Sequence, residues 1–386
     1  MSHSFTRTTI RIGSVALLML IVPVFGVAQT KPFIPVEGAS LKAKIDGAIT
    51  AGRANVPNGR FWVGYQFEVR PGVAVDFEIV NGSGVYVWND DSMGSDPRYE
   101  TRELGLFMLY DAQREQFIRA DVYNLKRDHE YSNYPVYWAG RISNEESLNY
   151  LKSMVDSTPD PNALASRALY TISLHDDARV EAMLIEFIRR PVVDALRNRA
   201  INLLGTIPES QAKNSVLTEI VRNEREDNEA RQAALGALSM SRSAAMLPVF
   251  QNLFETMTAR NLKTLALRGV SRSDNSEGAA TYLIHVADAE KDQQLRKSAV
   301  ANLGRVAGQK SLNALAATLD GGTDVELQKT AVTALARRPK DEAIPILIRT
   351  ARNHPSMEVR KTAIRVLGQT GDERAIALFS ELLSKD

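Results

Sequence analysis

The chain has 386 residues, of which 44% are hydrophobic and 24% are charged, a composition typical of folded proteins rather than of disordered ones. Its formal net charge is only +1, so no strong overall field favours nucleic acid as a partner. The chain contains no cysteine, which excludes disulfides, thiolate nucleophiles and cysteine-ligated metals.

Residues 1–28 have the features of a signal peptide. Two arginines, Arg7 and Arg11, precede an apolar run over residues 15–25, and small residues suit a cleavage site before Gln29. The run is short for a membrane span, which needs about 20 residues. We expect a cleaved signal peptide, no stable membrane insertion after cleavage, and an exported protein that is periplasmic or extracellular.

From residue 60 to residue 140 the sequence alternates with a period of two, which is typical of strands. We expect a β-rich domain over residues 29–142, built on a small antiparallel sheet of five or six strands. One short helix is expected earlier in this domain, over residues 40–49. The predicted strands cover residues 61–69, 73–79, 85–88, 104–110, 116–123 and 134–138.

All three tryptophans, Trp62, Trp88 and Trp138, lie in this domain. Alternation places Trp62 on the face of its strand opposite Phe61 and Val63. An exposed tryptophan could stack on a sugar ring, whereas a buried one would pack inside the sheet domain or against the first repeat helix. We favour packing and keep the sugar platform as the alternative.

Residues 143–146 (Ser-Asn-Glu-Glu) have the pattern of a capping box, in which the serine and Glu146 each satisfy a free N–H of a new helix. Apolar residues then recur on one helix face. We expect a bridging helix over residues 143–158 that connects the β domain to the rest of the chain.

The remaining residues, 159–386, repeat one pattern with a period of 32 to 34 residues. An alanine has an apolar residue four positions before it and another four positions after it, which places all three on one helix face. A constant period in this range indicates a solenoid. We expect seven helical hairpins, in which the small alanine lets neighbouring helices approach to about 8–10 Å. The repeat alanines are Ala168, Ala200, Ala234, Ala266, Ala299, Ala331 and Ala363.

The predicted helix ends agree with this pattern. Asp227, Asp292 and Asp324 each stand seven residues before a repeat alanine, where a carboxylate can cap the first turn. A glycine stands five residues after the alanine in three units, and we expect it to adopt the left-handed conformation that ends a helix. These glycines are Gly205, Gly304 and Gly368.

A basic residue stands three positions before the alanine in five units. Such a series could bind an acidic partner, or it could pair with acidic residues in adjacent turns. We favour structural pairing, because acidic residues are plentiful in these repeats and the net charge is near zero. The five residues are Arg197, Arg231, Lys263, Arg296 and Arg360.

The run V-R-K-T-A-I-R-V-L-G at residues 359–368, followed by G-D-E-R-A-I at 371–376, resembles a HEAT repeat of the short, bacterial, lyase-like kind. Similar runs stand at residues 295–304 and 196–205. The resemblance implies a mainly α fold: an α-solenoid of about seven HEAT-like hairpins, preceded by the β domain, with an extended concave surface for partners. The resemblance does not fix an activity.

Two kinds of enzyme share this type of repeat. Deoxyhypusine hydroxylases carry His-Glu pairs on repeat helices for iron, whereas the His-Glu pair of this chain, His129-Glu130, lies outside the repeats. Phycobilin lyases act on a cytoplasmic pigment, which an exported protein would not meet. Neither activity is therefore expected from the resemblance.

Local catalytic motifs are also missing from the sequence. Residues 304–311 (GRVAGQKS) have the wrong spacing for a phosphate loop and are expected to form a turn between helices. His175 precedes two aspartates in the turn of the first unit, so we expect it to be solvated and more often charged. We expect no catalytic residue, no cofactor-binding residue, no metal ligand and no cofactor, and a protein that is not an enzyme.

The sequence favours a non-enzymatic protein–protein interaction scaffold of the cell envelope, with a protein partner bound on the solenoid surface. The alternative is a glycan- or peptidoglycan-binding module, in which the aromatic β domain binds and the repeats act as a spacer. The last helix, expected over residues 373–384, keeps several apolar residues although solenoid ends normally need a polar outer face. We expect this end to dock another molecule, with self-association as one form.

Overall fold

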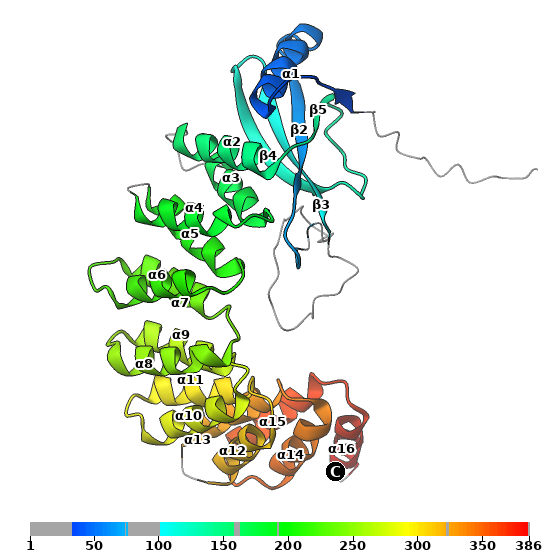
Figure 1. Ribbon diagram of the computed structural model, residues 1–386. Helices are drawn as coiled ribbons and strands as arrows, with labels where there is room; N and C mark the ends of the chain where they lie inside the picture. The colour runs from blue at the N-terminus through cyan, green and yellow to red at the C-terminus, as the bar shows by residue number, and fades with distance from the viewer. Residues whose placement is uncertain are drawn as a thin grey trace, which may run out of the picture.

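A computed structural model describes residues 33–73, 75, 101–157, 163–190, 193–321 and 324–384. The predicted signal peptide lies outside these ranges, as do the predicted strand over residues 85–88 and most of the one over residues 73–79. Within the described ranges, no helix is both long enough and apolar enough to cross a membrane. Figure 1 shows a small sheet at one end of the molecule and a curved stack of helices that leads away from it.

Within the described residues, the sheet contains five strands: β1 (Ile34–Pro35), β2 (Arg60–Glu68), β3 (Glu103–Asp111), β4 (Gln116–Asn124) and β5 (Val136–Arg141). Their order across the sheet is β1-β5-β2-β3-β4. As predicted, β2 pairs antiparallel with β3, and β3 with β4. β5 lies parallel to β2 and to β1, so the sheet is mixed rather than wholly antiparallel.

The parallel pairing follows from the connection between β4 and β5. Residues 125–135 cross one face of the sheet, so that β5 begins beside β2 and runs in the same direction. The connection brings Tyr131 and Tyr134 onto that face, where they pack with Trp62 and Phe107. Alternation in the sequence is the same for parallel and antiparallel strands and therefore could not reveal this crossover.

Trp62 is buried in this aromatic layer. Its side chain is 1% exposed, and its indole N–H donates to the carbonyl oxygen of Tyr131 at 3.0 Å. The prediction that Trp62 packs in a core is confirmed, and a role as an open sugar platform is wrong for this residue. Trp138 is half-buried in the same layer, and Trp88 lies outside the described residues.

Two helices cover the other face of the sheet. α1 (Leu41–Asn55) starts where the sequence predicted and extends beyond the predicted end, and α2 (Asn144–Ser157) occupies the stretch expected to bridge to the repeats. The Ser143 hydroxyl accepts from the Glu146 N–H at 3.3 Å, which is one half of the predicted capping box. The Glu146 carboxylate instead accepts from the Leu41 N–H at 3.1 Å and ties α1 to α2.

After α2 the chain forms the seven predicted hairpins, and the predicted fold class is confirmed. A short 3-10 turn, η1 (Ala244–Met246), precedes α8. The hairpins are α3 (Ala163–Leu174) with α4 (Arg179–Arg189), α5 (Asp194–Thr206) with α6 (Gln211–Arg222), α7 (Asn228–Leu238) with α8 (Leu247–Thr256), α9 (Arg260–Ser271) with α10 (Ser276–Ala289), α11 (Gln293–Leu303) with α12 (Gln309–Asp320), α13 (Val325–Leu335) with α14 (Lys340–Asn353), and α15 (Met357–Gly368) with α16 (Glu373–Leu383).

The odd-numbered helices form the tighter row of the stack. Each of them from α3 to α15 contacts the next, and each carries one repeat alanine that is at most 1% exposed. Alanine leaves room for this close approach. Figure 1 shows the odd row on the inner side of the curve and the even row on the outer side.

The predicted N-caps are present, but the predicted role of the glycines is not. Asp227, Asp292 and Asp324 each accept a hydrogen bond from a backbone N–H of the first turn. Gly304 has φ −63° and ψ −15°, so it is right-handed and not left-handed as predicted. The glycine is needed for packing instead, because a Cβ atom there would lie 2.4 Å from the carbonyl oxygen of Ala334 in the next hairpin.

One hydrophobic core runs from the inner face of the sheet through the seven hairpins. The sheet covers the outward side of the first hairpin, since β4 contacts α3 and Arg167 Nε donates to the carbonyl oxygen of Ala120 at 3.1 Å. The sheet therefore closes the N-terminal end of the solenoid.

His175 lies where the sheet meets the first hairpin, a contact that we call the joint. It is buried, contrary to the prediction of a solvated residue. It is 2% exposed and stacks on Phe67 with 4.3 Å between ring centroids. Nδ1 lies 2.8 Å from the Thr171 carbonyl oxygen and Nε2 lies 2.8 Å from the Ser147 hydroxyl, so a neutral ring can donate to the first and accept from the second. Burial lowers the pKa of His175 to about 4.

Candidate functional site

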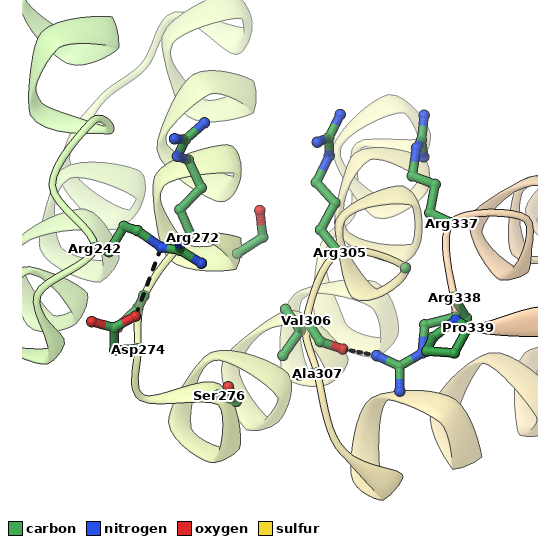
Figure 2. A pocket seen from close by; sticks show the side chains of 13 residues that line it. Arg242, Arg272, Asp274, Ser276, Arg305, Val306, Ala307, Arg337, Arg338 and Pro339 are labelled. Atoms are coloured by element: carbon green, nitrogen blue, oxygen red, sulfur yellow. Dashed lines mark hydrogen bonds and ion pairs between the residues drawn. The ribbon is translucent and has the colours of Figure 1, made fainter. Parts of the chain in front are cut away.

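A groove lies along the edge of the solenoid where the turns inside successive hairpins come together. It has a volume of about 520 Å³ and is lined by the turns of the four hairpins from α7/α8 to α13/α14. Figure 2 shows several arginine side chains around it. We name it the arginine groove, and its charged lining residues are Arg242, Arg272, Asp274, Arg305, Arg337 and Arg338.

Three of these arginines form a row with the period of the repeat. Arg272, Arg305 and Arg337 each stand six residues after a repeat alanine, in three consecutive hairpins. Their side chains extend in the same direction from successive turns (Figure 2). Arg305 and Arg337 are exposed and Arg272 is half-buried. Because stacked helices lie about 8–10 Å apart, we expect a similar spacing between neighbouring guanidinium groups.

Arg338 differs from the row, because it is a structural residue. It is 8% exposed, and its guanidinium donates to the carbonyl oxygens of Val306 and Gly308. It also forms an ion pair with Glu342 at 2.6 Å. These contacts join the turn between α11 and α12 to the start of α14. They therefore hold two of the segments that line the groove in place.

The charge of the arginine groove separates it from two other hollows. The groove is lined by five arginines and one aspartate, Asp274, whose carboxylate lies 3.8 Å from Arg242. A hollow of about 580 Å³ between α4, α5 and α6 has three arginines and three carboxylates. A hollow of about 320 Å³ beside His175 has four carboxylates and one arginine. Of these three sites, only the arginine groove therefore has more positive than negative side chains in its lining.

The basic series that the sequence predicted lies elsewhere and is structural. Arg197 Nε donates to the Ile188 carbonyl oxygen at the end of α4 at 2.9 Å, and its other guanidinium nitrogens pair with Glu226. Arg231 and Arg296 likewise donate to carbonyl oxygens at the ends of α6 and α10. These side chains satisfy the free carbonyls of the preceding helix, so the structural interpretation of the series is confirmed.

The arginine row was missed because the repeats were compared within their helices. The row has the same period as the repeat alanine, and an alignment of the turns would have revealed it. Residues 304–308 form the expected turn between α11 and α12, with Gly308 at φ 99°, whereas residues 309–311 already belong to α12. Across the described ranges, no group of three or more histidine, aspartate or glutamate side chains could hold a metal ion.

Comparison with known proteins supports the repeat assignment. Residues 312–386 match the family of HEAT repeats, which confirms the resemblance seen in the sequence. No curated protein matches the chain. Among solved structures, human deoxyhypusine hydroxylase in complex with glycerol is 15% identical over 61% of this chain and 90% of that chain, with a TM-score of 0.29. The complex of CpcE and CpcF of phycocyanin lyase from Nostoc sp. PCC7120 is 16% identical over 67% of this chain and 98% of that chain, with a TM-score of 0.33.

These two structures overturn the prediction that the chain is not an enzyme. They are named as a hydroxylase and a lyase, so an array of helical hairpins does not separate enzymes from binding proteins. The absence of local catalytic motifs from the sequence was too weak a basis for excluding enzymatic activity. At 15–16% identity the likeness concerns the fold alone and assigns neither activity to this chain.

Proposed function

We propose that the solenoid is a scaffold that binds another protein, and that the arginine groove holds an acidic, extended segment of that partner. The observation that carries this proposal is the row of Arg272, Arg305 and Arg337, one arginine per turn in three consecutive hairpins. Guanidinium groups suit carboxylates because their planar donors match the two carboxylate oxygens.

The spacing of the row selects a particular peptide conformation. A polyproline II segment has three residues per turn and rises about 3.1 Å per residue, so every third side chain lies on one face at about 9 Å intervals. This interval matches the expected 8–10 Å between stacked hairpins. An acidic residue at every third position would therefore meet one arginine after another.

A protein segment fits the groove better than a single-stranded nucleic acid. Single strands are usually bound by aromatic side chains on which bases stack, and none of the described residues that line the groove is aromatic. The net charge of +1 also gives no general attraction for polyanions. Serine hydroxyls at Ser271, Ser273 and Ser276 add polar groups to the lining.

The test is fluorescence anisotropy with labelled peptides. We expect a peptide of repeated Glu-Pro-Pro units to bind more tightly than a peptide of the same composition with its glutamates in one block, and a Lys-Pro-Pro peptide not to bind. Arg305→Gln, Arg272→Gln and Arg337→Gln should each weaken binding up to about fivefold, since an exposed ion pair is worth up to roughly 1 kcal/mol.

Arg349→Gln on α14 is the matched control, because Arg349 is an exposed arginine that pairs with Asp320 outside the groove. It should leave the affinity unchanged. Equal binding of the regular and the block peptide would reject the register argument. Tighter binding of single-stranded DNA of equal charge, lost in the same three variants, would replace the protein partner by a nucleic acid.

We further infer that the protein is exported and works in the cell envelope, with residues 1–28 removed and the chain divided into segments 29–142, 143–158 and 159–386. The support is the charged start, the short apolar run and the small residues before Gln29. Sequencing the N-terminus of the protein from an envelope fraction should find Gln29. A chain that retains Arg7 would contradict cleavage. The glycan-binding alternative loses its main support, because Trp62 is buried.

A further inference from the structure

The inner side of the solenoid carries a charge that the composition of the chain does not explain. On each odd-numbered helix, the residues one before and two after the repeat alanine lie opposite the buried stripe, and Figure 1 places these helices on the inner side of the curve. We name the residues at these two positions the concave face. None of them is acidic in any of the seven hairpins, although the chain contains 46 acidic residues. Four of them are arginines: Arg167, Arg199, Arg268 and Arg365.

Three of these arginines present free positive charge. Arg199 on α5, Arg268 on α9 and Arg365 on α15 are exposed, and within the described ranges none of them forms an ion pair. Their exposure is a property of the position in the repeat, because Asn202 and Thr333, two residues after the alanine in α5 and α13, are exposed as well. The concave face is therefore open to solvent in the middle of the array as well as in its last hairpin.

The neighbouring lysines differ, because they have acidic partners. Lys297 and Lys329, each two residues before a repeat alanine, both pair with Glu326, at 3.6 Å and 2.9 Å. Lys361 pairs with Glu358 at 3.4 Å. The free charge on the inner side of the solenoid therefore comes from the arginines of the concave face.

Arg199 is held by an aromatic ring rather than by a carboxylate. Its guanidinium carbon lies 5.8 Å from the centroid of the Tyr170 ring, and that of Arg167 lies 5.6 Å from the same centroid. Tyr170 is 3% exposed and is fixed in the core. Arg167 also lies 3.8 Å from Asp121 on β4, so Arg199 is the arginine of this pair whose charge is available to a ligand. A guanidinium placed over a ring is already oriented before an anion binds.

At α9 the concave face adjoins the arginine groove. Arg268 stands four residues before Arg272, the first arginine of the row in the groove. One cation near the end of a helix interacts favourably with the helix dipole, but two like charges four residues apart repel each other. An anionic ligand would relieve this repulsion, which the helix dipole alone does not explain.

Small residues lie between the arginines along the concave face. In α7, α11 and α13, both of its residues are glycine, alanine, serine or threonine, and a Cβ at Gly236 would meet no atom within 4 Å. A polypeptide can therefore approach the helices closely between one arginine and the next. Tyr170 is the only aromatic residue of the concave face and is buried, so bases of a single-stranded nucleic acid would find no ring on which to stack.

We propose that the concave face binds an acidic, extended polypeptide segment that lies along the array from Arg199 to Arg365. The inference rests on the proposed function, because it gives the same partner a second acidic segment beyond the one in the arginine groove. Five steps between stacked helices, from α5 to α15, correspond to about 45 Å at roughly 9 Å per step. An extended chain covers this distance with about 14 residues. Carboxylates near the start, the middle and the end of such a segment would each meet one exposed arginine.

The test measures binding of labelled oligoglutamates of about 6 and about 16 residues by fluorescence anisotropy. Arg272→Gln, Arg305→Gln and Arg337→Gln are combined in one full-length protein, the groove variant, so that the arginine groove no longer contributes. We expect the groove variant to bind the longer peptide at least about tenfold more tightly, because the shorter one cannot reach all three exposed arginines. Adding Arg199→Gln, Arg268→Gln or Arg365→Gln should weaken binding of the longer peptide about three- to fivefold.

The matched control is Arg222→Gln on α6, added to the same groove variant. Arg222 is exposed on the outer row of helices and donates to the Asn252 side chain at 2.8 Å, so its replacement changes the net charge by the same amount away from the concave face. We expect it to leave the affinity unchanged. Circular dichroism of each variant identifies any loss of folding separately.

Three outcomes would overturn the segment on the concave face. They are an equal loss of affinity in Arg222→Gln, equal binding of the two peptide lengths, and tighter binding of single-stranded DNA of equal charge that is lost in the same three variants. Loss of all oligoglutamate binding in the groove variant would also overturn it and leave the arginine groove as the proposed site. Unchanged binding of the Glu-Pro-Pro peptide in the groove variant would instead reject the arginine groove.

Discussion

A single glycine shows how closely the hairpins approach one another. Gly304 lies at the end of α11 in a right-handed conformation that alanine could adopt, yet the backbone of Ala334 leaves no room for a Cβ atom. Gly236 in α7 is the opposite case, because a Cβ there would meet no atom within 4 Å. The sequence cannot separate these two glycines, since each follows an apolar helical pattern.

We predict that Gly304→Ala destabilises the protein by about 1–3 kcal/mol, because the next hairpin must move to accept the methyl group. Gly236→Ala should instead raise stability by about 0.5–1 kcal/mol, since alanine favours the helix. Urea unfolding of both variants beside the unsubstituted protein measures the two effects. Equal changes in both variants would mean that close packing at Gly304 does not limit the contact.

His175 couples the stability of the joint to pH. Its pKa is about 4 in the folded protein, against an ordinary value of 6.5, because burial disfavours the charged ring. The unfolded chain therefore binds the proton more readily. The stabilising contribution is complete above pH 6.5 and is lost as the pH falls toward 4.

This shift predicts that His175 accounts for a loss of about 2 kcal/mol between pH 7 and pH 5. In His175→Gln the difference in unfolding free energy between these two pH values should shrink by about that amount. His285→Gln, which replaces an exposed histidine, is measured beside it as the matched control. An unchanged pH dependence in His175→Gln would show that the histidine is not held neutral at the joint.

At the scale of elements, the links between hairpins depend on side chains that reach the end of the preceding helix. Arg197 is the strongest of these, because it bonds to Ile188 of α4 and forms a bidentate pair with Glu226. Both partners are about one-fifth exposed, which limits screening by water. Arg189 on α4 lies 3.9 Å from Glu219 and is largely exposed, so its pair contributes little.

We predict that Arg197→Met lowers the free energy of unfolding by about 1–3 kcal/mol, because it leaves a helix-end carbonyl and Glu226 without their charged donor. Arg189→Met should change it by less than about 0.5 kcal/mol. Thermal or urea unfolding compares the two variants directly. A larger effect at Arg189 than at Arg197 would contradict the assignment of the basic series as helix caps.

At the scale of the whole molecule, the continuous core indicates that the sheet and the first hairpins unfold together. Phe67 lies at the joint, is 0% exposed and stacks on His175. All three tryptophans lie at or before residue 138, so tryptophan fluorescence reports on the sheet segment, whereas circular dichroism at helical wavelengths reports mainly on the repeats.

We predict that Phe67→Ala, which costs about 3–5 kcal/mol, shifts the fluorescence transition and the early part of the helical transition to lower temperature together. Phe254→Ala, a buried substitution on α8 far along the array, should move the helical signal and leave the fluorescence transition less affected. A fluorescence transition that separates from every part of the helical signal would show that the sheet folds independently of the repeats.

The sequence alone determined the seven hairpins, their alanines, the aspartate caps and four of the five described strands, because each depends on local periodicity or on a contact within one turn. Only the tertiary structure decided the parallel placement of β5, the burial of His175 and the packing role of Gly304, since each depends on a segment distant in the sequence. The arginine groove depends on both sequence and tertiary structure. The regular spacing of its arginines is present in the sequence, but the stacking of the turns brings Arg272, Arg305 and Arg337 into one row.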